Sequence, residues 1–127
     1  MVNNLDRDRQ INRLLQFLLQ MPMPNFYRTI LREQVSCSSV IVEEYVDCLK
    51  ILFEDNHRAS MFPLGLPTLL QGGQVLKDSG PISFHVFVEK GYLVQFELVD
   101  MGLNNIDWDY FWSHTPIYDV DYFEHNF

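Results

Sequence analysis

The sequence has few cysteines, few basic residues and no long apolar run. Its two cysteines, Cys37 and Cys48, match no zinc-binding or redox spacing, which predicts reduced, structural thiols. The apolar stretches, such as residues 51–53, fall far short of the ~20 residues needed to cross a bilayer. The N-terminal segment has mixed charge and leads into no apolar run of signal-peptide length. These absences predict a cytoplasmic protein with no membrane contact.

Basic residues are outnumbered by acidic ones, with nine Lys and Arg against 17 Asp and Glu and a formal net charge of −8. Because contacts to phosphate need clustered Lys and Arg, this charge argues against nucleic acid and anionic membranes as partners. No glycine-rich phosphate loop, no Gly-x-Ser-x-Gly and no His-Glu-x-x-His motif occurs. The sequence therefore predicts a protein that is not an enzyme, with no cofactor and no metal ligands.

The length and the composition indicate one globular domain covering residues 1–127. Hydrophobic residues make up 47% of the chain and charged residues 20%, as in ordinary folded domains. We divide the domain into a helical part (1–34), an antiparallel sheet (38–100) and an acidic, aromatic C-terminal tail (101–127). The predicted fold class is α+β: two N-terminal helices packed on a meandering, mostly antiparallel sheet of four to five strands.

Two amphipathic segments open the chain. Residues 5–21 carry apolar side chains at the i, i+3, i+4, i+7 spacing of a helix, and Pro22 and Pro24 end it. Residues 25–34 repeat this spacing and predict a second, shorter helix. From Ser38 the period changes to the alternation of strands, with candidates at residues 40–43, 49–54 and 68–71.

A β-hairpin is the clearest signal. Residues 82–89 and 92–99 alternate apolar and polar side chains, and Lys90-Gly91 joins them with Gly in the left-handed position. A two-residue turn without a bulge pairs His85 with Phe96 and turns Glu97 to the opposite face. A register shift of one residue would put Glu97 and His85 on the same face.

The hairpin also carries a family resemblance. The leucine-rich helix at residues 13–20 is followed by His85-Val86, by Gly91-Tyr92-Leu93, and by Glu97 between apolar neighbours. This order over residues 12–106 resembles a family of small acidic bacterial proteins of unknown function, in which an LHV strand leads through GYL into ELEIY. The resemblance implies the α+β hairpin fold and no activity.

The tail concentrates the negative charge. Residues 1–90 contain ten acidic and nine basic side chains, whereas residues 91–127 contain seven acidic and none basic. Eight of the 18 aromatic residues lie in residues 101–127. Two interpretations stay open and can both hold: the aromatic side chains pack over the sheet edge, or some stay exposed among the carboxylates as a docking surface.

Our leading hypothesis is a non-catalytic protein-binding module that masks or regulates a basic protein partner, as immunity proteins neutralise toxins. Carboxylates would steer the partner and aromatic side chains would anchor it. A structural or accessory domain, as a monomer or a homodimer, is the first alternative. A small enzyme or ligand-binding domain that uses Glu97 or His85 is the second. The predicted partner-binding residues are Asp107, Trp108, Asp109, Phe111, Trp112, Asp119, Asp121, Tyr122 and Glu124.

Overall fold

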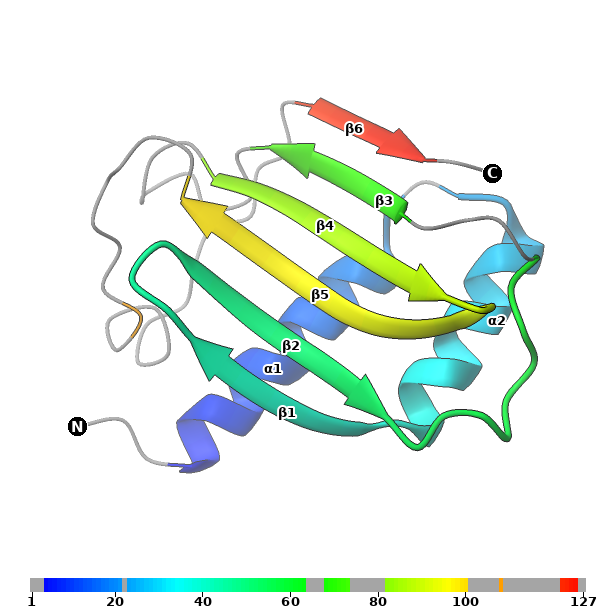
Figure 1. The fold of residues 1–127 in the computed structure, drawn as a ribbon, viewed down its shortest axis with the longest axis horizontal. Coiled ribbons are helices and arrows are strands. Elements are labelled where there is room, and N and C mark those ends of the chain that lie inside the picture. The colour runs from blue at the N-terminus through cyan, green and yellow to red at the C-terminus, as the bar shows by residue number, and fades with distance from the viewer. Residues whose placement is uncertain are drawn as a thin grey trace.

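Two helices pack on one face of a six-stranded antiparallel sheet (Figure 1). The computed structural model describes residues 4–21, 23–63, 68–73, 82–100, 108 and 122–125. The helices are α1 (Asn4–Leu19) and α2 (Asn25–Cys37). The strands are β1 (Ser39–Glu44), β2 (Cys48–Glu54), β3 (Thr68–Gly73), β4 (Ile82–Glu89), β5 (Tyr92–Asp100) and β6 (Tyr122–His125). The α+β class with two N-terminal helices on an antiparallel sheet is thus confirmed.

The strand order is β1-β2-β5-β4-β3-β6, which is not a simple meander. After the β1–β2 hairpin the chain crosses to β3, and β4 and β5 then bring it back to pair with β2. The sheet has one strand more than expected, because β6 from the acidic tail pairs with β3. Four residues are too short a strand for the alternation in the sequence to reveal.

The core lies between the helices and the sheet. The expected leucine stripe of α1 supplies Leu14, Leu15 and Leu18, all buried, and α2 adds Ile30 and Leu31. The strands contribute their alternate residues, so that burial follows period two along β2 and β4. The edge-to-face contacts Phe17–Phe84 (5.9 Å) and Phe84–Phe96 (6.2 Å) connect α1 with β4 and β5.

Helix α2 ends at Cys37, three residues beyond residue 34, where the sequence predicted its end, and a buried glutamine holds it against the sheet. The Gln34 side chain is fully buried, and its Oε1 accepts a hydrogen bond from the N–H of Leu93 at 2.7 Å. Its Nε2 donates to the carbonyl oxygens of Ser60 and Gly91. These bonds satisfy main-chain groups at the β4–β5 turn, so Gln34 fixes α2 against the sheet.

A β-bulge corrects the predicted register of the β4–β5 hairpin. The turn pairs Glu89 with Tyr92 as expected, with Lys90 and Gly91 both at positive φ. The register then shifts, so that Val88 pairs with Leu93 but Phe87 pairs with Gln95. Leu93 and Phe96 are three residues apart and both fully buried, which strict alternation forbids and one extra residue on β5 allows.

Candidate functional site

The face of the sheet opposite α1 and α2, here called the open face, carries a row of charged side chains. Leu49 and Ile51 point into the core, so Lys50 between them points to the open face. The register pairs Lys50 with Glu43 on β1 and with Glu97 on β5. Glu97 in turn pairs with His85 on β4. The row therefore crosses four strands, which belong to two hairpins that are distant in sequence.

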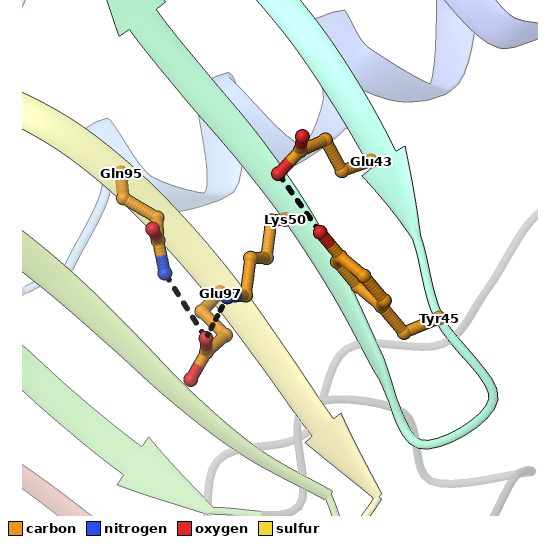
Figure 2. A network of polar contacts seen from close by, with 5 residues as sticks. All are labelled: Glu43, Tyr45, Lys50, Gln95 and Glu97. Carbon is orange, nitrogen blue, oxygen red and sulfur yellow. Dashed lines mark hydrogen bonds and ion pairs between the residues drawn. The ribbon is translucent and has the colours of Figure 1, made fainter.

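A polar network joins most of this row (Figure 2). The Glu97 carboxylate accepts a hydrogen bond from Gln95 Nε2 at 3.0 Å, and the same oxygen, Oε2, lies 3.8 Å from Lys50 Nζ. Lys50 Nζ also lies 5.3 Å from the centre of the Tyr45 ring, a cation–π contact. The Tyr45 hydroxyl donates to Glu43 at 3.2 Å. Lys50 is therefore engaged by Glu97 and by Tyr45.

Two weak acids in this region have a raised pKa. The hydrogen bond to Glu43 raises the pKa of Tyr45 above its ordinary value, and the negative charge of Glu43 adds to the effect. Partial burial raises the pKa of the Cys48 thiol, helped by the charges of Glu97 and Asp47. A raised pKa leaves less thiolate at neutral pH, so Cys48 is a poor nucleophile.

The predicted separation of His85 from Glu97 is wrong, because the β5 bulge places the two residues opposite each other on one face. In the described part of the chain, however, no hydrogen bond joins them. The His85 ring lies 3.3 Å from the Ser83 hydroxyl and stacks on Phe87. The Glu97 carboxylate is held by Gln95 and Lys50. The two side chains thus share a face without forming an acid–base pair.

The closed end of the β1–β2 hairpin, residues 43–47, combines carboxylates with exposed apolar surface, and we call it the hairpin end. Val46 is 86% exposed and Tyr45 46% exposed. Glu43, Glu44 and Asp47 surround them in the chain. The Tyr45 N–H donates to the Cys48 carbonyl at 2.8 Å and closes the turn. Sequence analysis missed this site, although a tyrosine and a valine among three carboxylates at a turn were its visible signal.

Trp108 attaches the tail to the hairpin end. Its side chain is only 6% exposed, and its indole Nε1–H donates to the Tyr45 carbonyl oxygen at 2.7 Å. The sequence predicted Trp108 as an anchor for a partner, but its side chain is packed rather than exposed. Tyr122 and Glu124 lie in β6, paired with Gly73 and Gln71. The other predicted partner-binding residues lie outside the described residues: Asp107, Asp109, Phe111, Trp112, Asp119 and Asp121.

Two depressions occur elsewhere on the surface. One, of about 600 Å³, is lined by Cys37, Ser39, Asp55, His57 and Arg58. Within the described chain, no hydrogen bond joins its thiol, imidazole and carboxylate into a catalytic set. The other, of about 550 Å³, lies along α1 and is lined by Arg9, Asn12, Arg13, Gln16, Phe17 and Gln20.

The described residues show no metal site and no membrane-spanning helix. The described His, Cys, Asp and Glu side chains form no group of three that could hold a metal ion. Neither α1 nor α2 combines the length and the apolar character that a membrane span requires. No family model, curated protein or solved structure matched this chain. The resemblance at the hairpin stays a prediction.

Proposed function

We propose that this chain is a non-catalytic protein-binding module that masks or regulates a basic protein, as immunity proteins do with toxins. The hairpin end is the observation that carries the proposal. It presents Tyr45 and Val46, both exposed, between the carboxylates of Glu43, Glu44 and Asp47. Apolar side chains within a charged rim are typical of the centres of protein interfaces.

The distribution of charge between the two layers supports a basic partner. Residues 4–37, which form the helices, contain three acidic and five basic side chains. The described residues from 38 onward contain nine acidic and three basic ones. A field of one sign on one side of a protein orients an oppositely charged partner and raises its association rate. The sheet side is therefore the side that we expect a basic protein to approach.

The hairpin end keeps its negative charge because the nearest lysine is engaged. Lys50 is the one basic residue in residues 39–55, which contain five carboxylates. Its ammonium group lies between Glu97 and the Tyr45 ring. Glu43 and Asp47 at the hairpin end can then attract Lys or Arg of a partner, and Tyr45 and Val46 supply the apolar contact.

Trp108 gives the tail a place in this proposal. Its hydrogen bond to Tyr45 joins the tail to the hairpin end, and Asp107 and Asp109 flank it in the sequence. Trp108 is buried and therefore supports the hairpin end rather than contacting the partner. The other tail residues that the sequence predicted stay predictions: Asp107, Asp109, Phe111, Trp112, Asp119 and Asp121. Tyr122 and Glu124 lie in β6, at the opposite edge of the sheet from the hairpin end, and are not part of the proposed surface.

The test is affinity capture from the native lysate with three forms of the tagged protein: wild type, a hairpin-end variant and a control. The hairpin-end variant is Glu43→Gln, Glu44→Gln, Asp47→Asn. The control, Glu54→Gln, Asp55→Asn, Glu89→Gln, removes the same charge at the opposite end of the sheet (Figure 1).

We expect wild type and control to retain a stoichiometric basic protein that high salt releases, and the hairpin-end variant to lose it. With the isolated partner, association at low salt should slow about tenfold or more in the hairpin-end variant. The proposal fails if no basic protein is retained, or if both variants bind it equally.

A further inference from the structure

Strand β1 is an edge of the sheet, and its outer main-chain groups can be identified. The Tyr45 N–H donates to the Cys48 carbonyl on β2, so the main-chain groups of Tyr45 point toward β2. Main-chain groups in an antiparallel pair point inward at every second residue. The main-chain groups of Glu43 and Ile41 therefore also point toward β2, whereas the N–H and C=O groups of Val40 and Val42 point away from the sheet. No described strand pairs on that outer side.

Most of this edge lacks the usual protection against pairing with another strand. Natural edge strands are blunted by charged side chains, above all lysine, by proline or by a bulge, and the charges of β1 are confined to its last two residues, Glu43 and Glu44. Residues 39–44 contain no proline and no lysine, and β1 pairs with β2 through six residues without a register shift. Ile41, in the middle of the strand, is 44% exposed. β1 thus offers a regular, apolar edge for one more strand.

The order of residues along β1 matches an antiparallel copy of itself. Read outward from Ile41, the strand has a valine on each side, then Ser39 in one direction and Glu43 in the other. A twofold axis at Ile41 places Ile41 opposite Ile41, Val40 opposite Val42, and Ser39 opposite Glu43. Apolar residues then meet apolar ones, and each carboxylate meets a hydroxyl that can donate to it.

We propose that β1 pairs with β1 of a second copy of this chain, antiparallel and centred on Ile41. The Val40 N–H of each copy donates to the Val42 carbonyl of the other, and the Val42 N–H donates to the Val40 carbonyl. The two sheets become one continuous sheet with both open faces on the same side. This dimer does not depend on the proposed basic partner.

The carboxylates disfavour registers that are shifted toward the C-terminal end of β1. Moving the axis to Val42 places Ile41 opposite Glu43, and moving it to Glu43 places two carboxylates opposite each other, which destabilises a strand pair. The net charge of −8 on each copy opposes association through long-range repulsion, which salt screens. The dimer should therefore tighten as salt rises, whereas a complex with a basic protein should weaken.

The register is tested with single cysteines in a chain that carries Cys37→Ser and Cys48→Ser. Ile41→Cys should form a disulfide-linked dimer under mild oxidation, since residues opposite each other at a non-hydrogen-bonded position lie within disulfide range. Ser39→Cys and Glu43→Cys should not link to themselves, but a mixture of the two should give the mixed dimer. Equal linking of all three single variants, or no linking of Ile41→Cys, overturns the proposal.

The association itself is measured by sedimentation over a range of concentration and salt. Wild type should reach twice the 15.0 kDa of one chain. Ile41→Lys places two ammonium groups opposite each other in the dimer and should raise the dimer dissociation constant about tenfold or more. Met61→Lys is the matched control, because Met61 is 46% exposed and lies off the strand. A wild type that stays monomeric, or equal effects of the two lysines, contradicts the dimer.

The hairpin end is intact in Ile41→Lys, so its capture of a basic protein should persist. Loss of the dimer alone and loss of the partner alone are therefore distinguishable results.

Discussion

The two faces of the sheet are built from the same strands and differ in almost every property. On the helix-covered face, Leu49, Phe84 and Phe96 have no exposed surface. On the open face, Lys50 and Glu97 form a half-buried ion pair beside other partly exposed side chains. Because neighbouring residues in a strand point to opposite faces, one chain segment can supply stability on one side and recognition on the other.

Several polar groups of the open face are paired with one another. Glu97 accepts from Gln95 and pairs with Lys50, and Tyr45 donates to Glu43. These contacts hold the side chains of the open face in one arrangement.

The largest expected effect is on stability, where a substitution on the helix-covered face should cost far more than one on the open face. Phe96→Ala removes a fully buried ring that packs edge-to-face on Phe84, and should lower the free energy of unfolding by about 3–5 kcal/mol. Phe87→Ala, on the partly exposed open face, should cost about 1 kcal/mol. Urea denaturation measures both. Equal losses would mean that the open face is as structural as the core.

A smaller difference is expected for two glutamines, one on each side of the sheet. Gln34→Leu removes the hydrogen bonds that the Gln34 side chain makes with the N–H of Leu93 and the carbonyl of Gly91. This loss should lower the free energy of unfolding by about 2–3 kcal/mol. Gln95→Leu breaks one partly exposed hydrogen bond to Glu97 and should cost about 0.5 kcal/mol. Thermal or urea unfolding compares them, and a Gln95→Leu loss as large as that of Gln34→Leu would remove the contrast.

The smallest effect is a change in titration on the open face. Glu43→Gln should lower the Tyr45 pKa toward the ordinary value of 10.0, because Glu43 raises it through a hydrogen bond and its charge. Lys50→Met should shift the pKa upward, because the lysine charge lowers it. The titration of the Tyr45 ring carbon by NMR measures both shifts.

The stability linked to Tyr45 has a definite sign. Its raised folded-state pKa means that the contribution is fully present below the unfolded value of 10.0 and disappears as pH rises through the folded pKa. In Glu43→Gln this loss should begin at a lower pH. Unchanged titration in both variants would mean that Tyr45 is uncoupled from the network.

Much of the fold was predictable because its signals are local. The leucine stripe of α1, the alternation in β2 and β4, and the Lys90-Gly91 turn each lie within a few residues and specify one element. The end of α2 was missed because the residues at positions 35–37 (Val, Ser and Cys) have low helix propensity. Of the site, the acidic and aromatic character of the tail was predicted, but the hairpin end was missed.

The sequence by itself determined the two helices, the strands β1 to β5 and the excess of acidic residues toward the C-terminus. Only the tertiary structure decided the β5 bulge, the pairing of β6 with β3 and the contact of Trp108 with Tyr45. The bulge lets Leu93 and Phe96 share one core, and burial in that core is a property of the packed layers. The other two features join segments about fifty or more residues apart, and no local pattern encodes which distant segments meet.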